Sequence, residues 1–409
     1  MNINASLDKS KFQEYFNNAA FFSVVCFMVF IPSSTALMNL FIFLTLIFLL
    51  LSGNLKNNLV IAWRNPVSKV ALILFFLLIL SFNWTIDSSE AVDVLKKYNE
   101  LWYIALILPL FNSDRRRNIG IKAYLISMGI VLFGVYLMFF EVMLPIEWTL
   151  KGRSHHFNID GGFASHIITN ILMAFAMFIA AHKSILSRSF FKVPYFIFFV
   201  FSAYYVLFIS TGTSGQILGI SLIFLFIIQH TGVRAALLIP GILALITILT
   251  FSSENNGLRF AIDKIYVRWH HYTYTDTAGN NTRPRIYIHA VKLIRDEPWI
   301  GTGVGSYEEA LRSKQPEFYA VTTVAKKNPH NEYLLITTQL GFVGLFVLLY
   351  LFYTQAAYSE RIREKEYKYI AQGLVILIII GCIGNSMILD SREGHFWAFF
   401  SALLFSKFK

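Results

Sequence analysis

The residue best suited to chemistry in this sequence is His330, within Pro329-His330-Asn331. It stands where a long polar segment meets an apolar run long enough to cross a membrane. Ionisable residues beside a membrane span are functional candidates by default. A neutral imidazole here can accept a proton from a hydroxyl group, and the positive end of the following helix favours an anionic group nearby. Position alone favours a histidine that only caps a membrane helix, and a general base at His330 is the functional alternative.

Three arginines extend this candidate site toward phosphate chemistry. Arg283 and Arg285 lie in the polar segment that ends at His330, and Arg153 lies in an earlier loop, 151–156. Guanidinium groups bind phosphate oxygens through paired hydrogen bonds, and a diphosphate needs more than one guanidinium. Taken alone, each arginine favours contact with lipid headgroups or an ordinary ion pair, and phosphate binding is the functional alternative.

Other polar motifs give weaker signals. The pairs His155-His156 and His270-His271 predict no metal site, because adjacent residues do not converge on one ion and no cysteine or carboxylate cluster completes a ligand set. The stretch Ser210–Gly215 is expected to be a plain turn between two spans rather than an anion cradle. The stretch Gly301–Gly305 superficially resembles a dinucleotide loop, but it follows Pro298 and a helix instead of a strand, so we reject that interpretation.

The composition defines the class of protein. The chain has 409 residues, 56% of them hydrophobic, with a formal net charge of +11. That apolar content predicts a polytopic membrane protein, and the basic excess is explained by cytoplasmic loops, so no nucleic-acid partner is expected. The two cysteines, Cys26 and Cys382, lie in apolar runs and predict buried thiols rather than a disulfide or metal site. Residues 1–14 do not resemble a cleavable signal peptide, so the first span is expected to remain.

The apolar runs predict an all-α architecture of about twelve membrane helices. They cover residues 16–32, 35–52, 67–84, 98–112, 121–143, 163–182, 193–210, 214–230, 235–252, 332–354, 370–388 and 395–406. Their interiors are nearly free of charge. We divide the chain into nine membrane helices in residues 1–252, a large loop with short helices and the catalytic residues in 253–331, and three further membrane helices in 332–409.

Basic residues orient these spans. They concentrate in alternate gaps and at the chain end, and include Lys56, Arg64, Arg115, Arg116, Arg117, Lys183, Arg188, Lys192, Arg234, Arg361, Arg363, Lys365, Lys368, Lys407 and Lys409. The positive-inside rule then places both termini in the cytoplasm and the large loop outside. In a bacterial inner membrane that loop is periplasmic.

The clearest element of the large loop is a helix over residues 283–297. Thr282 suits the N-cap, Pro284 suits the first turn, and Pro298 ends the run. Three basic residues share one face at spacings of four and three: Arg285, His289 and Lys292. Apolar packing is expected from Ile286, Val291, Leu293 and Ile294.

Two glycines follow His330 in the next span. By spacing, His330 and Gly341 are expected on one face of that helix. Gly341 and Gly344 form a small-residue pair that would let a neighbouring helix approach closely.

These residues together resemble the O-antigen ligase family, within the bacterial membrane enzymes that transfer glycans from polyprenyl diphosphates. His330-Asn331 and, after nine intervening residues, Gly341-Phe342-Val343-Gly344 are similar to the family's His-Asn signature. Two further patterns match: the loop residues Arg285, Ile286, Ile294, Pro298, Gly301, Gly303 and Gly305, and the earlier loop Arg153, Phe157, Asn158, Phe163 and Ala164. The sequence departs from the family pattern at Leu345 and at His289. It also has Ser214 or Gly215 where many relatives carry an arginine in the turn between two spans, so we assign no phosphate role to this turn.

The resemblance implies a glycosyltransferase that needs no nucleotide sugar, cofactor or metal. The implied donor is O-antigen polysaccharide on undecaprenyl diphosphate, and the acceptor is a sugar hydroxyl of lipid A–core oligosaccharide, so the product is complete lipopolysaccharide. His330 would be the general base, and Arg153 and Arg285, with Arg283, would hold the diphosphate. Asn331, Gly341, Gly344 and His289 would support the site. Aromatic residues of the loop would stack on sugar or simply pack: Trp269, Tyr272, Tyr274 and Tyr287.

Two alternatives stay open. An O-antigen polymerase or a protein O-oligosaccharyltransferase uses the same type of donor with another acceptor. A transporter or lipid flippase would need broken helices or charges deep within the spans.

Overall fold

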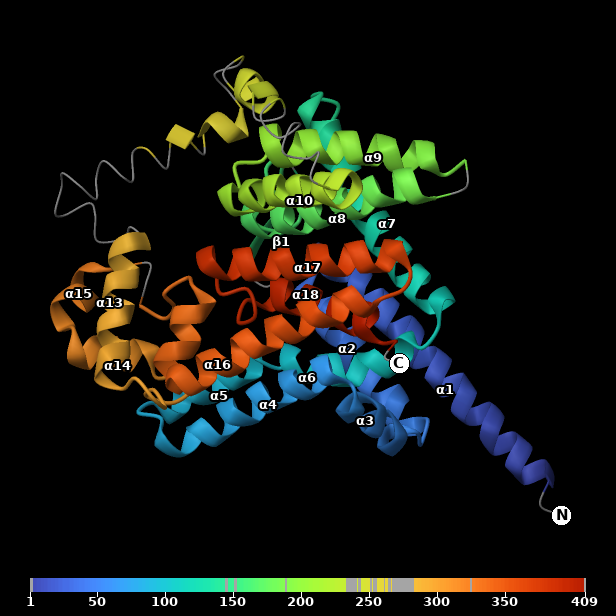
Figure 1. Ribbon diagram of the computed structural model, residues 1–409, viewed down its shortest axis with the longest axis horizontal. Coiled ribbons are helices and arrows are strands. Elements are labelled where there is room, and N and C mark those ends of the chain that lie inside the picture. Colours follow the sequence, from blue (N-terminus) through green and yellow to red (C-terminus); the bar gives the residue numbers. More distant parts are fainter. Residues whose placement is uncertain are drawn as a thin grey trace.

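The computed structural model describes residues 3–143, 146–150, 153–187, 190–232, 283–323 and 326–407, with short stretches between residues 241 and 266. These residues are mostly helical (Figure 1). The first part of the chain forms α1 (Ile3–Phe30), α2 (Thr35–Leu51), α3 (Leu55–Arg64), α4 (Pro66–Leu80), η1 (Ser81–Trp84), α5 (Ser88–Lys97), α6 (Glu100–Ile107), η2 (Leu108–Phe111) and α7 (Asp114–Phe139). A hairpin follows, β1 (Ile146–Leu150) and β2 (Arg153–Phe157), then α8 (His166–Leu186), α9 (Lys192–Tyr204), the π-helical turn η3 (Tyr205–Ile209) and α10 (Thr213–Thr231). The last part forms α13 (Arg283–Asp296), α14 (Tyr307–Lys314), α15 (Pro316–Val321), α16 (Glu332–Arg361), α17 (Lys365–Gly384) and α18 (Ser391–Phe405).

Short polar side chains set many of the helix starts. The side chain at the N-cap accepts a hydrogen bond from a first-turn amide in six helices, at Ser34, Asn65, Asp87, Ser113, Ser165 and Asn331. Such caps satisfy amides that have no partner within the helix. They therefore fix where these six helices begin.

The predicted multi-pass membrane architecture is confirmed, but the count of twelve spans is not. Among the described residues, seven helices are long and apolar enough to cross a membrane, or eight if the bent pair α2 and α3 is one span. Two predicted spans, 98–112 and 395–406, correspond to short helices in the structure. Helix α6 has 8 residues before η2, and α18 has 15. The predicted span 235–252 lies largely outside the described residues.

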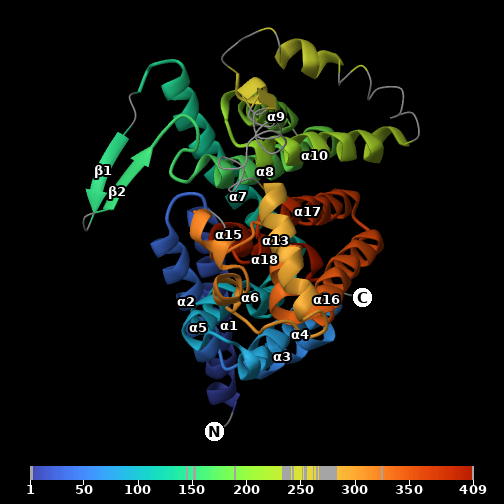
Figure 2. The same ribbon diagram turned by 90° about the vertical axis from the view of Figure 1, so that its left-hand side faces the viewer.

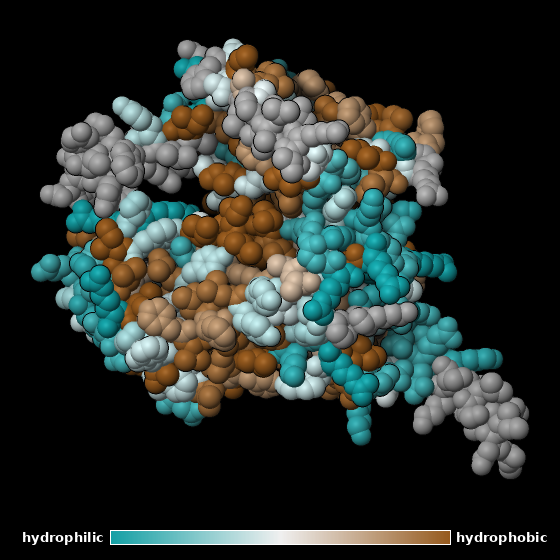
Figure 3. All heavy atoms as spheres, in the orientation of Figure 1, coloured by the Kyte–Doolittle hydropathy of each residue, from teal (hydrophilic) through white to brown (hydrophobic). Residues whose placement is uncertain are grey.

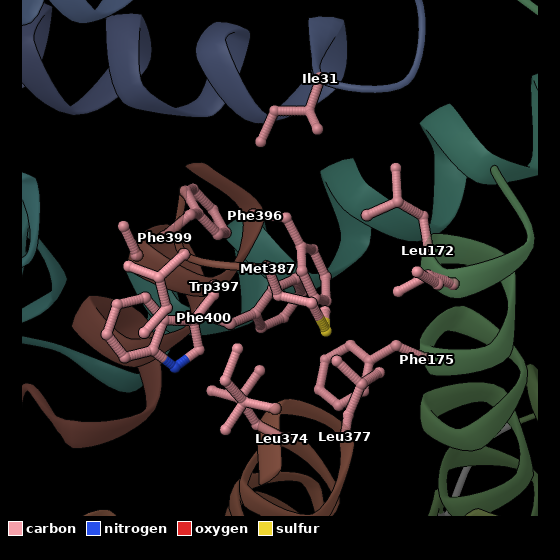
Figure 4. Packing of buried hydrophobic residues seen from close by; sticks show 14 of the residues in the cluster. Ile31, Leu172, Phe175, Leu374, Leu377, Met387, Phe396, Trp397, Phe399 and Phe400 are labelled. Carbon is pink, nitrogen blue, oxygen red and sulfur yellow. The ribbon is translucent and has the colours of Figure 1, made fainter. Parts of the chain in front are cut away.

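Helix α18 forms the centre of the bundle. Its residues from Glu393 to Phe405 are all buried, as expected for a helix enclosed on every side. Figure 4 shows its aromatic side chains packed among Leu374 and Leu377 of α17 and Leu172 and Phe175 of α8. The rings of Phe396 and Phe175 meet edge to face with centroids 5.3 Å apart.

The expectation of nearly charge-free span interiors has an exception beside α18. Glu100 of α6 is 1% exposed, and its carboxylate lies 2.9 Å from His395 Nδ1 of α18. Glu393 is also buried. Short polar contacts between helices thus occur inside the apolar core.

The bundle has two polar ends. Helices α13, α14 and α15 gather at one end, whereas α1 begins and α18 ends at the other (Figure 1). Figure 3 shows apolar surface across the middle of the molecule, between hydrophilic surfaces at the two ends. The hairpin β1–β2, antiparallel with Leu150 opposite Arg153, departs from the expected all-α fold and stands out from the bundle (Figure 2).

Candidate functional site

Helix α13 forms as the sequence predicts, from Arg283 to Asp296. Pro284 lies in its first turn, and Pro298 follows its end. The packed face consists of Ile286, Ala290, Leu293 and Ile294. Val291, expected to pack, is 39% exposed and lies on the outer side of the helix.

One face of α13 binds the segment before α16, which we call the seam (residues 328–331). Arg283 Nη1 donates to the carbonyl of His330 at 2.9 Å and also to the carbonyl of Gly384. The hydroxyl of Tyr287, one turn further along α13, donates to the carbonyl of Ile383 at 2.7 Å and to that of His330 at 3.4 Å. The first two turns of α13 therefore join the seam to the C-terminal end of α17.

Two asparagines complete the seam. Asn328 Oδ1 accepts from the amide of His330 at 2.8 Å and from the hydroxyl of Ser386 at 2.7 Å. Asn331 is the N-cap of α16: its Oδ1 accepts from the amide of Leu334 at 3.0 Å, and its Nδ2 donates to the carbonyl of Ile383 at 2.9 Å. The cap is thus Asn331, and the interpretation that His330 only caps the helix is wrong.

His330 is half-buried and has a left-handed backbone, with φ of +54°. For a residue other than glycine this conformation costs about 1–2 kcal/mol. A hydrogen bond from a charged group contributes about 1.5–3 kcal/mol and a neutral one about 1 kcal/mol. The bonds from Arg283 and to Asn328 therefore suffice to hold His330 in a conformation that it would otherwise leave. Strained residues held in this way cluster at functional sites.

Gly341 interrupts α16 instead of continuing it. Its backbone has φ of +63° and ψ of −162°, and a Cβ there would lie 2.2 Å from the carbonyl carbon of Trp299. The expectation that His330 and Gly341 share a helix face is wrong, because His330 precedes the helix and Gly341 breaks it. The expectation that a neighbouring helix approaches the glycine pair is also wrong. A loop approaches Gly341, and a Cβ at Gly344 would meet Leu340 of the same helix.

The approaching segment, residues 298–305, is the glycine loop. It replaces the helical hydrogen bonds that the break removes, through four backbone contacts: Thr302 N to Thr338 O (3.0 Å), Gly303 N to Gln339 O (2.9 Å), Phe342 N to Pro298 O (2.7 Å) and Val343 N to Trp299 O (3.3 Å). In a continuous helix, residues 342 and 343 would donate to residues 338 and 339. Irregular backbone in a membrane bundle persists only where protein satisfies it in this way.

The glycine loop is therefore a brace and not a ligand site. Its next two amides are also used, by Ser81 Oγ at 3.1 Å from Val304 N and by Gln339 Oε1 at 2.9 Å from Gly305 N. These contacts agree with rejecting a dinucleotide loop. Because the loop follows α13 directly, it fixes the end of α13 opposite Arg283 and so helps to set where that arginine meets the seam.

Arg285 and His289 lie on another side of α13. Two residues beyond Arg283 correspond to about 200° around the helix, so Arg285 does not share the seam face. His289 contacts Gln315 through Nδ1, and its ring stacks on Phe318 with centroids 3.7 Å apart. Burial lowers the pKa of His289 below its ordinary value. His289 thus packs α13 against α15, and Arg285 is half-buried on the same side.

Not every predicted site residue meets the seam. Arg153 begins β2, and Figure 2 shows its hairpin at the edge of the molecule, away from α13. Thr282, Trp269, His270, His271, Tyr272 and Tyr274 lie outside the described residues. The structure therefore brings together Arg283, Tyr287, His330 and Asn331, but not Arg153.

Sequence reasoning missed Glu332, the first residue of α16. Its carboxylate is fully buried and accepts from the hydroxyl of Tyr98 at 2.8 Å and from the amides of Ile388 and Leu389 at 3.0 and 3.3 Å. It ties the start of α16 to the junction of α5 and α6 and to the turn before α18. The sequence signal that could have indicated its role is an acidic residue directly after the N-cap Asn331, although the side chain at that helix position is ordinarily exposed to solvent.

The turn at Ser210–Gly215 behaves as a plain turn. Its Thr211 donates from both the amide and the hydroxyl to the carboxylate of Asp160, at 2.7 and 2.6 Å. The backbone amide of Thr211 therefore already donates to a carboxylate of the protein itself and is not left for a bound anion.

The fold and the seam define a multi-pass membrane protein with a hydrogen-bonded polar site at one end of its bundle. Residues 197–349 match the protein family described as O-Antigen ligase. The match contains α13, the glycine loop, His330 and Gly341, and it supports assignment of the chain to this family of membrane glycosyltransferase-like enzymes, which includes ligases and polymerases. A comparison with curated proteins finds no match.

Proposed function

We propose that this chain is an O-antigen ligase of the bacterial inner membrane. It transfers O-antigen polysaccharide from undecaprenyl diphosphate to a sugar hydroxyl of lipid A–core oligosaccharide on the periplasmic side. The observation that carries the proposal is the left-handed His330, held by Arg283 and Asn328 beside the N-terminus of α16. These contacts fix the backbone from which the imidazole extends, and a general base must be positioned within reach of the proton that it takes.

In the proposed reaction His330 takes the proton of the acceptor hydroxyl. The acceptor oxygen forms a bond to the anomeric carbon while the bond from that carbon to the diphosphate oxygen breaks. The leaving diphosphate keeps the electron pair, and attack from the opposite face inverts the anomeric centre. Because the lipid diphosphate is itself an activated leaving group, the transfer uses neither ATP nor a nucleotide sugar.

We assign the three arginines to two functions, binding of the diphosphate and orientation of His330. We assign Arg285 and Arg153 to the diphosphate, where their charge would neutralise the developing negative charge. Arg283 already binds two carbonyls, so we assign it first to orienting His330. Arg153, on the separate hairpin, would reach the donor from another direction.

The test uses His330→Ala and Arg285→Ala in cells that lack their own ligase. Each variant is scored for O-antigen on lipid A–core at matched amounts of membrane protein. We expect His330→Ala to lose at least about a hundredfold in transfer, since general base catalysis contributes about 10²–10⁴. Arg312→Ala is the matched control, because Arg312 is an exposed arginine of the same segment that pairs only locally with Glu309.

Two results would contradict the proposal. Normal capping of lipopolysaccharide by His330→Ala would remove the proposed base. If the wild-type chain lengthens glycan on the lipid carrier without loading lipid A–core, the enzyme is a polymerase instead.

A further inference from the structure

A cationic groove lies at the end of the bundle opposite the seam. It has a volume of about 700 Å³ and lies between α3, α4 and the last turns of α16. We define it by six of its lining residues: Trp63, Arg64, Lys69, Tyr350, Tyr353 and Arg361. Three cations and three aromatic rings thus converge from three helices.

The groove stands at the depth of lipid headgroups. Helix α16 is broken at Gly341, and its residues 342–361 alone extend about 30 Å at about 1.5 Å per residue, close to the thickness of the hydrocarbon core of a bilayer. With the seam at one membrane surface, Arg361 therefore reaches the other. Figure 1 shows α3 at the same end of the bundle as the start of α1 and the end of α18.

Helix α3 has the properties of an interfacial helix. It is bent by 112° from α2, so it does not continue the direction of that span. Four of its apolar side chains are 41–51% exposed: Leu59, Val60, Ile61 and Trp63. Such a helix places apolar side chains in the outer acyl region and its polar groups among the headgroups.

The charge of the groove is uncompensated. No Asp or Glu lines it, and within the described chain none of its three cations pairs with a carboxylate. Instead, Lys69 Nζ lies 5.5 Å from the ring centre of Trp63, and Arg361 Cζ lies 4.8 Å from that of Tyr358. Cation–π contacts hold the side chains near the rings while leaving their hydrogen-bond donors for another acceptor.

We propose that the cationic groove binds the headgroup of an anionic phospholipid. The phosphate accepts hydrogen bonds from Arg64, Lys69 and Arg361, and the acyl chains lie along the exposed apolar side of α16 at Phe346 and Leu349. A zwitterionic lipid is disfavoured, because its own ammonium group would face three cations. The bound lipid links α3 and α4 to α16 and stabilises the end of the bundle away from the seam.

The test measures lipid retention on the full-length protein by native mass spectrometry in detergent. Phosphatidylglycerol and phosphatidylcholine are the two lipid probes. We expect Arg64→Gln/Lys69→Gln/Arg361→Gln to lose at least about tenfold in phosphatidylglycerol binding, since each cation near anionic lipid contributes about 1 kcal/mol. The charge-preserving variant Arg64→Lys/Lys69→Arg/Arg361→Lys should retain binding, which guards against a misfolded variant.

A matched control removes three exposed cations outside the groove, in Arg115→Gln/Lys122→Gln/Arg363→Gln. This control should bind phosphatidylglycerol as the wild type does, and equal losses in both triple variants would overturn the proposal in favour of a general surface potential. Equal binding of phosphatidylcholine would also overturn it. Displacement of phosphatidylglycerol by glycerol phosphate at similar concentration would show a soluble anion site instead.

Discussion

The two ends of α16 hold positive charge in different ways. At the seam, Arg283 is bound by the carbonyls of His330 and Gly384, so its geometry is set by backbone atoms. At the cationic groove, Arg361 lies over the ring of Tyr358 and has no carboxylate partner among the described residues. The function of the seam end therefore depends on hydrogen-bond geometry, whereas that of the groove end depends on charge.

The largest effect is expected from Gly341→Ala, which attacks the geometry of the seam end. The alanine Cβ would lie 2.2 Å from the backbone of Trp299, in a φ/ψ region that favours glycine. Strain and clash together should destabilise the protein by more than about 3 kcal/mol. The measurement is thermal unfolding of the purified protein, with the amount of folded protein in the membrane.

Gly232→Ala is the control for this prediction. Gly232 has a similar backbone, with φ of 59° and ψ of −135°, but a Cβ there would meet nothing within 4 Å. It should cost only the backbone strain, about 1–3 kcal/mol. Equal destabilisation by the two variants would show that the glycine loop does not press on the break.

The same contrast explains what could be predicted from the sequence. The bounds of α13 follow from Pro284, Pro298 and a local apolar period, and His330 follows from its place beside an apolar run. The exchange of hydrogen bonds across Gly341 and the contact of Arg283 with Gly384 join segments far apart in the chain. No local pattern encodes such contacts, and the left-handed backbone of His330 depends on them.

The next effect compares one substitution at both ends. In Arg283→Lys the charge remains, but the flexible lysine ammonium does not have the fixed position from which the guanidinium Nη1 donates to both carbonyls. His330 would then relax, and a shift of about 1 Å at a catalytic group lowers turnover by about 10- to 100-fold. We expect kcat of the transfer reaction to fall while KM for the donor changes little.

Arg361→Lys is the counterpart at the groove. It keeps the charge and should change neither transfer nor phosphatidylglycerol binding by more than about twofold. If Arg283→Lys is equally harmless, the seam also depends only on charge and the comparison fails.

A smaller effect is expected from Glu332→Gln, which keeps the shape of a buried side chain but replaces one of its acceptor oxygens. The carboxylate accepts hydrogen bonds from the Tyr98 hydroxyl and from two backbone amides of the turn before α18. The side-chain NH₂ of glutamine would face one of these donors in place of an acceptor oxygen. Leaving that group unsatisfied should destabilise the fold by about 1–3 kcal/mol in thermal unfolding. Glu309→Gln, which removes only a local pair with Arg312, should stay within about 0.5 kcal/mol of the wild type.

The smallest effect on stability is expected at Lys327, the residue directly before the seam. Lys327 is 65% exposed, and its Nζ lies 3.3 Å from Glu90 and 3.8 Å from Glu308. The hydrogen bond and charge of Glu90, followed by the charge of Glu308, raise the pKa of Lys327 above its ordinary value of 10.5. A raised lysine pKa means that the pair stabilises the fold below pH 10.5 and loses this contribution as the pH rises through the folded-state pKa. Lys327→Gln should therefore lower stability at neutral pH by less than about 1 kcal/mol, and 1 M salt should shrink the difference. A salt-independent loss of more than about 2 kcal/mol would contradict this. It would show that Lys327, three residues before His330, is held by specific hydrogen-bond geometry and not by charge.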